Sequence, residues 1–186
     1  VIVSGASRGL GLGIAKDLLD VGYKVSVCSR TPSEALIELE KLNSHLKWFQ
    51  AEIGNAEQTA EFVKGACAWA GEIPLWGVVN NAGIAKEGVL ATFPNIDSDE
   101  VLQINLNGAL YLAREALRVF LKQNSPGRII NISSIIGSRG YTGLAAYSAS
   151  KAALIHFSKC AAMEAAAANV RINVIAPGVI STGATV

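Results

Sequence analysis

A tyrosine, a lysine and a serine form the group of side chains best suited to chemistry in this chain. Tyr147 and Lys151 lie four residues apart in the run Tyr-Ser-Ala-Ser-Lys, and Ser134 comes 13 residues before the tyrosine. Residues four apart on a helix share one face. A free phenol titrates near pH ~10, and a neighbouring ammonium favours the phenolate and lowers that pKa. We therefore expect Tyr147 to exchange a proton, with Ser134 holding a substrate oxygen. Because such a pair is also common on helix surfaces, the rest of the chain must decide between the two interpretations.

A glycine-rich turn opens the chain. Residues 1–5 form an apolar run typical of a buried parallel strand, and glycines at positions 5, 9 and 11 separate this run from a helical pattern that starts at Leu12. Gly5 permits a tight turn, Gly9 lets the backbone approach a phosphate, and Gly11 allows close contact with the helix. A helix N-terminus offers free amides and a positive dipole end to a pyrophosphate. The arrangement predicts a dinucleotide site.

The end of the second predicted strand, residues 24–29, indicates which dinucleotide binds. Domains that use NAD usually place an acid here for the ribose 2′-hydroxyl, whereas an arginine accommodates a 2′-phosphate. This chain has Ser29 and Arg30, with Arg8 in the glycine turn. Two guanidinium groups that converge on a dianion favour NADP(H) over NAD. The alternative is that Arg30 is a solvated loop residue.

Strand and helix patterns alternate along the whole chain. Further strands are expected at residues 46–51, 75–80, 127–133 and 169–176, and further helices at 31–43, 56–70, 97–121 and 145–168. This alternation predicts one α/β domain over residues 1–186, a doubly wound parallel sheet of the Rossmann type with strand order 3-2-1-4-5-6. Pro32 is expected near the first turn of its helix, and Ser98 or Asp97 as the cap of the helix at 97–121. A local break is expected around Asn105, because asparagine suits a helix interior poorly without a partner.

Composition restricts the class of protein. The chain has 186 residues and a net charge of +1, so no basic field favours nucleic acid as a partner. Its three cysteines are scattered, without the spacing of a metal site, and we expect no metal. No apolar run is long enough to cross a membrane, and no signal peptide opens the chain. We therefore expect a cytoplasmic protein without a membrane partner. Val1 falls inside a strand pattern, so we expect the sequence to be cut at both ends.

Together these motifs resemble the short-chain dehydrogenase/reductase family, and the resemblance covers the whole chain. In order, the motifs are residues 4–11, Asn80-Asn81-Ala82-Gly83, Asn105, Ser134, Tyr147-x-x-x-Lys151 and Pro177-Gly178. Residues 127–178 are most similar to bacterial 3-oxoacyl-acyl-carrier-protein reductases. The resemblance implies NADPH-dependent reduction of a ketone to a secondary alcohol, with a 3-oxoacyl thioester as the expected substrate.

The resemblance also implies roles for individual residues. Tyr147 would be the general acid in reduction, Lys151 would lower its pKa and hold the nicotinamide ribose, and Ser134 would polarise the carbonyl group. Asn105 would hold a water that links Lys151 to solvent. The residues expected to contact NADP(H), besides Tyr147 and Lys151, are Gly5, Ser7, Arg8, Gly9, Leu10, Gly11, Arg30, Glu52, Ile53, Asn81, Ala82, Gly83, Pro177, Gly178, Ile180 and Thr182. Arg30 would meet the 2′-phosphate, Glu52 and Ile53 the adenine, and the last four residues the nicotinamide.

The chain departs from the family pattern at a few places. Ser4 replaces a threonine and keeps its hydroxyl, whereas Glu52 stands where an aspartate is typical. The substrate lid and seventh strand of the family would lie beyond Val186. The helices that carry Asn105 and Tyr147 often pair subunits in this family, which implies a homodimer or homotetramer.

Other functions are compatible with part of this pattern. A reductase or dehydrogenase of another small carbonyl or hydroxy compound keeps the same residues, and a nucleotide-binding but inactive subunit keeps the fold alone. A sugar epimerase or dehydratase of the extended branch is disfavoured, because that branch spaces its glycines as Gly-x-x-Gly-x-x-Gly and this chain does not.

Overall fold

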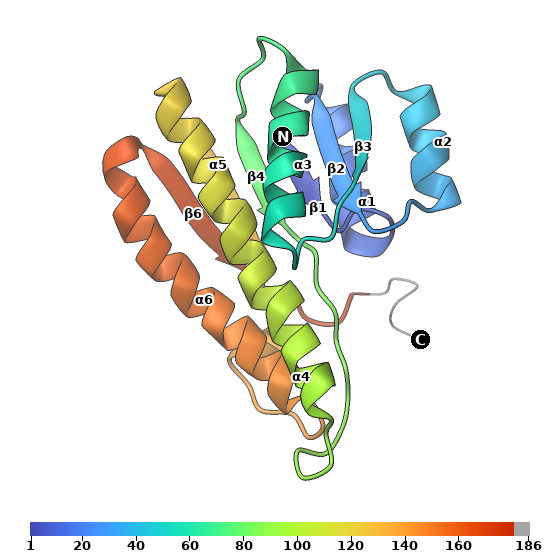
Figure 1. Ribbon diagram of the computed structural model, residues 1–186, viewed down its shortest axis with the longest axis vertical. Coiled ribbons are helices and arrows are strands. Elements are labelled where there is room, and N and C mark those ends of the chain that lie inside the picture. Colours follow the sequence, from blue (N-terminus) through green and yellow to red (C-terminus); the bar gives the residue numbers. More distant parts are fainter. Residues whose placement is uncertain (181–186) are drawn as a thin grey trace.

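Six parallel strands form one sheet in the order β3-β2-β1-β4-β5-β6 (Figure 1). The computed structural model describes residues 1–180 of the chain. The strands are β1 Ile2–Ser4, β2 Val25–Ser29, β3 Leu46–Gln50, β4 Gly77–Asn80, β5 Gly127–Ile132 and β6 Val170–Ile175. Every adjacent pair is parallel. The predicted doubly wound sheet and its strand order are confirmed.

Helices connect the strands. They are α1 Gly9–Asp20, α2 Glu34–Leu42, α3 Ala56–Ala70, α4 Asn95–Leu102, α5 Ala109–Gln123 and α6 Ala145–Ala165, with 3-10 turns η2 Ile135–Gly137 and η3 Ala166–Ala168. Two predicted starts are wrong. Helix α2 begins at Glu34 and not at residue 31; Pro32 lies near its first turn as predicted, and Ser33 caps the helix by accepting from the Leu36 amide. Helix α4 starts before Asp97, after Pro94, and no side chain caps it.

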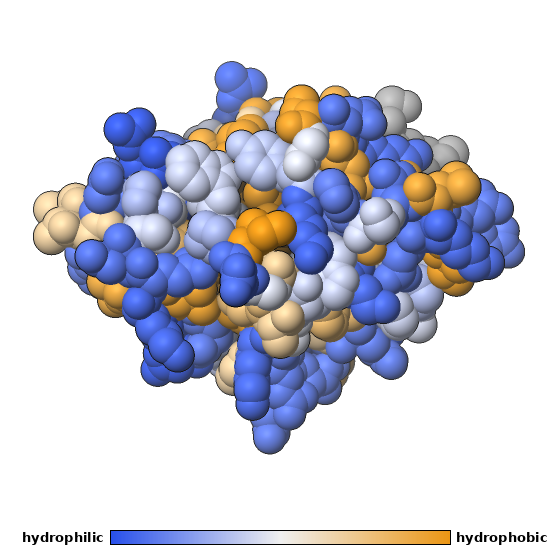
Figure 2. All heavy atoms as spheres, turned by 90° about the horizontal axis from the view of Figure 1, so that it is seen from above, coloured by the Kyte–Doolittle hydropathy of each residue, from blue (hydrophilic) through white to orange (hydrophobic). Residues whose placement is uncertain are grey.

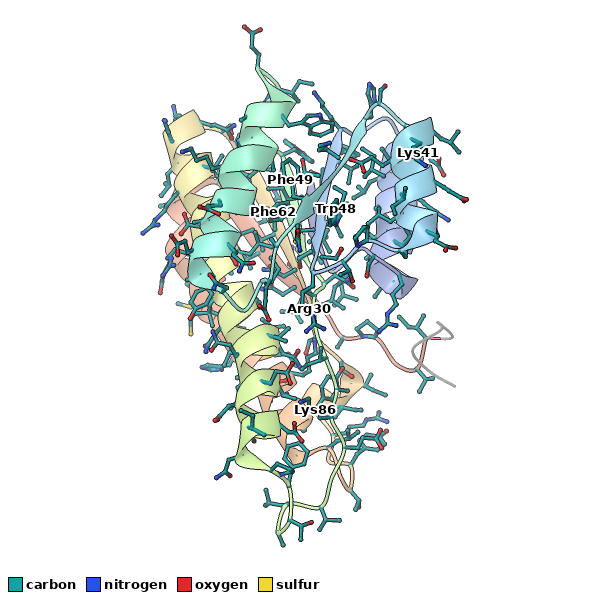
Figure 3. All side chains as sticks on the ribbon, turned by 45° about the vertical axis from the view of Figure 1, so that its right-hand side comes forward. Arg30, Lys41, Trp48, Phe49, Phe62 and Lys86 are labelled. Atoms are coloured by element: carbon teal, nitrogen blue, oxygen red, sulfur yellow. The ribbon has the colours of Figure 1, made fainter. Side chains whose placement is uncertain are left out.

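The two faces of the sheet carry separate helix layers, since side chains alternate along each strand. Helices α1 and α2 lie on one face, where Leu12 and Leu36 pack with Val3 and Val27. Helices α3, α5 and α6 lie on the other face (Figure 1). There, Phe49 of β3 lies against Phe62 of α3, with ring centroids 5.6 Å apart (Figure 3). This double cover fixes the carboxyl ends of β1, β2, β4 and β5 relative to one another.

A π-helix, η1 Gln103–Gly108, separates α4 from α5. The predicted break around Asn105 is therefore present, and it widens the helix by one residue per turn. Gly108 is required on the inner side of this segment, because a Cβ there would lie 2.7 Å from Ile53 Cγ2. The π-helix thus packs Gly108 closely against Ile53 in the loop after β3.

The surface seen from above is mostly hydrophilic, with apolar residues interspersed (Figure 2). Over residues 1–180 no helix is both long and apolar enough to traverse a membrane. Within the same range, no three His, Cys, Asp or Glu side chains gather as metal ligands would.

Candidate active site

A pocket of about 570 Å³ lies at the carboxyl ends of β1, β2 and β4. This is where open α/β sheets bind ligands. Twelve of the residues expected to contact a dinucleotide line it, namely Gly5, Ser7, Arg8, Gly9, Leu10, Gly11, Arg30, Glu52, Ile53, Asn81, Ala82 and Gly83. The fold therefore brings together residues from four separate segments of the chain.

Glycines shape the floor of the pocket. Gly5 has φ +67°, and a Cβ on it would lie 2.7 Å from Ala82 Cα. A Cβ on Gly11 would lie 2.4 Å from the carbonyl oxygen of Gly5. Arg8, the N-cap residue of α1, makes no side-chain cap hydrogen bond, so the first amides of this helix remain available to a ligand. The cradle fits a pyrophosphate, whose oxygens accept from such amides.

Ser4 and Asn81 hold the two sides of the cradle together. Ser4 Oγ accepts from the amides of Asn81 at 3.1 Å and Ala82 at 3.0 Å. Asn81 Nδ2 in turn donates to the carbonyl oxygens of Ser4 and Gly5, each at 3.0 Å. The hydroxyl of Ser4 therefore joins β1 to the segment after β4.

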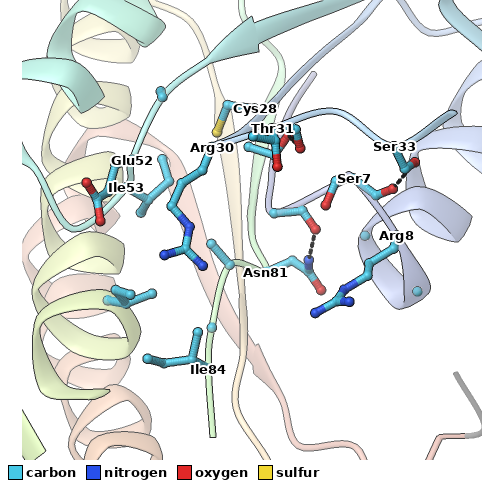
Figure 4. Close-up of a pocket in the computed structure, with 18 of the residues that line it drawn as sticks. Ser7, Arg8, Cys28, Arg30, Thr31, Ser33, Glu52, Ile53, Asn81 and Ile84 are labelled. Carbon is cyan, nitrogen blue, oxygen red and sulfur yellow. Dashed lines mark hydrogen bonds between the residues drawn. The ribbon is translucent and has the colours of Figure 1, made fainter. Parts of the chain in front are cut away.

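Two arginines enter the pocket from different sides. Figure 4 shows Arg30 reaching in between Ile53 and Asn81, and Arg8 approaching from the side of α1. Among the described residues, neither guanidinium group takes part in a salt bridge. Thr31 and Ser33 line the same end of the pocket. Two exposed cations beside hydroxyl groups provide a suitable place for a phosphate dianion.

The side of the pocket that was expected to hold an adenine is less polar than its residue types suggest. Ile53 is buried and lines the wall, whereas Glu52 is exposed. The backbone amide of Glu52 donates to Gln58 Oε1 at 2.9 Å. The apolar wall is therefore supplied by Ile53, with Ala51 beside it.

Ser134 lies directly beyond the carboxyl end of β5 and is buried. Its Oγ accepts from the Ile136 amide at 3.2 Å, which starts the 3-10 turn η2. The neighbouring Ser133 Oγ donates to the Lys151 carbonyl oxygen at 2.9 Å. These bonds join the end of β5 to the first turns of α6, so Ser134, Tyr147 and Lys151 lie together.

Lys151 is a buried lysine, with 4% of its surface exposed. Its Nζ donates to the carbonyl oxygen of Ile132 at 2.9 Å and lies 5.7 Å from the ring centroid of Tyr147. Burial lowers the pKa of Lys151 to about 8, because the charged form loses hydration. Lys151 is therefore mostly an ammonium group at neutral pH and loses its proton at a mildly alkaline pH.

Tyr147 corrects one expectation from the sequence. The Lys151 ammonium was expected to lower the pKa of the phenol, but burial raises the pKa above its usual value. Hydrogen bonding with the Ser134 side chain acts in the opposite direction and is weaker than burial. The reason is geometric, since Lys151 Nζ is directed to the Ile132 carbonyl oxygen. At neutral pH the phenol keeps its proton.

Asn105 is fully buried in the π-helix and bonds to backbone and side chain. Its Oδ1 accepts from the Ile84 amide at 2.8 Å, and its Nδ2 donates to the Ile84 carbonyl oxygen at 2.9 Å. A Cβ on Gly83 would lie 3.2 Å from Asn105 Oδ1 and 3.4 Å from Lys151 Nζ. Since Gly83 also lines the pocket, it marks where the dinucleotide pocket meets the catalytic candidates.

The segment expected to hold the nicotinamide follows β6. The Pro177 carbonyl oxygen accepts from the Ile135 amide at 3.0 Å, which places Pro177 and Gly178 beside the turn that carries Ser134. Ile180 is exposed at the end of the described chain. Thr182 lies outside the described residues. Pro177, Gly178 and Ile180 do not line the 570 Å³ pocket, and neither do Tyr147 and Lys151.

Sequence reasoning missed several residues of the pocket wall. These are Cys28, Ser29, Thr31, Pro32, Ser33, Ala51, Ile84 and Ile104. The signal for Thr31 to Ser33 was present, because they directly follow Arg30 at the end of β2. No local pattern marks Ile104, which lies in the π-helix η1 and lines the pocket from there.

The chain is similar to known proteins over its whole length. Residues 1–186 match the family model described as short chain dehydrogenase. The chain is 35% identical over 188 residues to 3-oxoacyl-acyl-carrier-protein reductase FabG of Staphylococcus epidermidis, a match that covers 99% of this chain and 76% of that protein. It is 36% identical over 183 residues to carbonyl reductase family member 4 of Xenopus tropicalis, covering 98% of this chain and 76% of that protein.

Solved structures show the same fold. A candidate short-chain alcohol dehydrogenase from Sinorhizobium meliloti superimposes with a TM-score of 0.92 at 32% identity, covering 100% of this chain and 73% of that one. A short-chain dehydrogenase from Streptomyces avermitilis gives 0.90 at 28% identity, with 98% and 67% covered.

Proposed function

The chain belongs to the short-chain dehydrogenase family, and we propose that it reduces a ketone to a secondary alcohol with NADPH. The observation that carries this proposal is the junction at Gly83. There the 570 Å³ pocket meets the buried Lys151, and the Tyr147 phenol and the Ser134 hydroxyl lie beside that lysine. A nucleotide-binding subunit without activity has no use for a buried ammonium group that, among residues 1–180, has no carboxylate partner.

The preference for NADPH rests on the two arginines. Arg30 follows β2 where a ribose 2′-group would lie, and no carboxylate competes with a phosphate on that strand end. The Arg8 and Arg30 side chains would hold the 2′-phosphate, and the amides at the start of α1 would hold the pyrophosphate. Ile53 would support the adenine.

The side chains of this protein supply binding, orientation and a proton. A reduced nicotinamide, when bound, supplies a hydride for the carbonyl carbon. Ser134 Oγ holds the carbonyl oxygen of the ketone. Tyr147 donates the phenolic proton to that oxygen, so that one hydride and one proton convert C=O into CH–OH. Lys151 then stabilises the phenolate that remains, because its ammonium group lies 5.7 Å from the centroid of the Tyr147 ring.

The proposed substrate class is a 3-oxoacyl thioester. Support comes from the FabG relatives, whose name states that reaction. The likeness to a carbonyl reductase of Xenopus tropicalis supports a second candidate, another small ketone or hydroxy compound, with the same residues in the same roles. The two candidate functions differ only in the substrate that is reduced.

We also propose that the protein is a cytoplasmic homodimer or homotetramer assembled through the helices that carry Asn105 and Tyr147. Leu121 near the end of α5 is 61% exposed, and Met163 of α6 is 81% exposed. Burial of such side chains against a second copy removes apolar surface from water. Sedimentation at several protein concentrations tests this, and a monomer at all of them would contradict it.

The test of function is NADPH consumption with a panel of ketones. Acetoacetyl thioesters should be reduced with a higher kcat/KM than simple cyclic or aliphatic ketones, and NADH should serve poorly. Preference for a small ketone would favour the carbonyl reductase candidate. Absence of turnover with every ketone, together with tight NADPH binding, would support the inactive subunit instead.

A further inference from the structure

One buried hydroxyl joins the π-helix to the first turns of α6. Asn105 Nδ2 donates to Ser150 Oγ at 3.0 Å, and Ser150 Oγ donates to the Tyr147 carbonyl oxygen at 2.7 Å. Ser150 and Asn105 are both fully buried. We call this arrangement of Asn105, Ser150 and Tyr147 the Ser150 clasp.

The clasp uses the serine hydroxyl as donor and acceptor at once. A buried polar group that loses its partner carries the full cost of its desolvation. The other two bonds of the Asn105 side chain go to Ile84, so the amide is held from two directions, by the segment after β4 and by α6. Without Ser150, only the contact with Ile84 orients it.

The Ser150 clasp matters because it joins two candidate catalytic residues, Asn105 and Tyr147. Asn105 lies in an irregular π-turn, whose geometry depends on its partners more than that of a regular helix. Tyr147 belongs to the first turn of α6, where a small rotation moves the phenol relative to Ser134 and Lys151. A displacement of the order of 1 Å at a reacting group can cost about a hundredfold in rate.

We propose that Ser150 is a positioning residue: its hydroxyl fixes the Asn105 amide and the Tyr147 turn relative to each other. This inference rests on the proposed reductase function for its effect on turnover, but the geometric part stands without it. Ser150 does not line the 570 Å³ pocket and acts through the two residues that it joins.

The same helix provides a matched control. Ser158, two turns further along α6, is 2% exposed, accepts from Asn131 Nδ2 at 2.7 Å, and donates to the Leu154 carbonyl oxygen at 2.7 Å. Its chemistry copies that of Ser150, but its partner Asn131 lies within β5, where it accepts from Asn80 Nδ2 of β4 at 2.7 Å. Ser158→Ala therefore removes an equivalent pair of hydrogen bonds without touching the clasp.

The first measurement needs no turnover. In Ser150→Ala, amide hydrogen exchange at Ile84 should accelerate at least about tenfold, because the Asn105 Oδ1 that accepts from this amide is less firmly held. Ser158→Ala should leave Ile84 unchanged. Equal exchange at Ile84 in wild type and Ser150→Ala overturns the proposal.

The second measurement is kinetic. With NADPH and an acetoacetyl thioester, Ser150→Ala should lower kcat about tenfold or more with KM changed less than about twofold, whereas Ser158→Ala should keep kcat within about twofold of wild type. In the Asn105→Ala background the effect of Ser150→Ala on kcat should vanish, since the two residues act as one unit. Full additivity of the two substitutions, or an equal loss in Ser158→Ala, overturns the proposal.

Ser150→Cys covers the case in which the alanine variant folds poorly. Its thiol fills nearly the same space and forms only weak hydrogen bonds, so kcat should fall between wild type and Ser150→Ala. A cysteine variant with wild-type kcat and wild-type Ile84 exchange overturns the proposal. If the wild-type protein reduces no ketone while Ile84 exchange still responds to Ser150→Ala, the proposed function is wrong and the clasp stands.

Discussion

The environment of Lys151 is the strongest indication of a catalytic site in this structure. Lysine is almost never fully buried without a partner. Here 4% of it is exposed, its Nζ donates to a backbone carbonyl oxygen, and among the described residues no carboxylate pairs with it. A fold that maintains such a group loses stability at neutral pH. Perturbed titratable groups of this kind gather at functional sites.

This loss predicts a pH dependence of folding. The pKa of Lys151 is about 8 in the folded protein against an ordinary value of 10.5, so between these values the unfolded chain binds more protons and raising the pH favours the folded state. Relative to Lys151→Met, wild type should gain up to about 3 kcal/mol of unfolding free energy from this window. Chemical unfolding of both proteins at a series of pH values measures it. A difference that stays flat across the window would contradict the buried ammonium.

Arg30 should decide the choice of cofactor. Loss of its guanidinium removes charge-assisted hydrogen bonds to a 2′-phosphate, so Arg30→Ala should raise the KM for NADPH about thirtyfold and leave that for NADH nearly unchanged. Lys41→Ala is the control, because it removes one exposed positive charge from α2 outside the pocket. Steady-state kinetics with both cofactors measure the ratio. Equal effects of the two substitutions would show a general charge effect.

At the scale of elements, two glycines in α1 are present for different reasons. One is required by close contacts at the pocket, whereas the other only lowers the helix propensity. A Cβ on Gly11 would lie 2.4 Å from the Gly5 carbonyl oxygen, whereas a Cβ on Gly13 meets nothing within 4 Å. Gly11→Ala should cost about 1–3 kcal/mol through overpacking and weaken NADPH binding. Gly13→Ala should stabilise the protein by up to about 1 kcal/mol. Urea unfolding and NADPH fluorescence titration test both variants; similar behaviour of the two would refute the close approach.

Elements were predictable where local pattern decides them. The apolar runs and glycine turns identified every strand in the sheet, because buried parallel strands need continuous apolar residues. The starts of α2 and α4 were wrong, since caps depend on which hydroxyl or backbone group finds an amide. Asn105 signalled a break, but its π-helical form and its bond to Ser150 depend on contacts between segments far apart in sequence.

The same limit applies to the candidate site. Spacing placed Tyr147 and Lys151 on one helix face, and the glycine turn placed the pocket. The direction of the Tyr147 pKa could not be obtained in this way, because it depends on burial and on where Lys151 Nζ is directed. Sequence thus predicted the candidate reacting groups, and tertiary structure determines their protonation.

At the scale of the whole molecule, the cofactor should act as a stabiliser. Its pocket is built from β1, β2, β4 and the loops that follow them, so binding ties together segments that unfolding separates. At about 100 times its Kd, NADPH should add about 2.7 kcal/mol and raise Tm by roughly 5–10 °C. Thermal unfolding with NADPH, NADH or neither measures this. A shift of equal size with NADH would contradict the role given to the arginines.

The most direct test of the account is turnover by Tyr147→Phe at saturating NADPH and ketone. The substitution removes only the phenolic oxygen, and this oxygen is the proposed proton donor. We predict that NADPH affinity by fluorescence titration stays within about twofold of wild type, while kcat falls by about a thousandfold, the scale of a lost general acid. A phenylalanine variant that reduces the ketone at close to the wild-type rate would contradict the central claim.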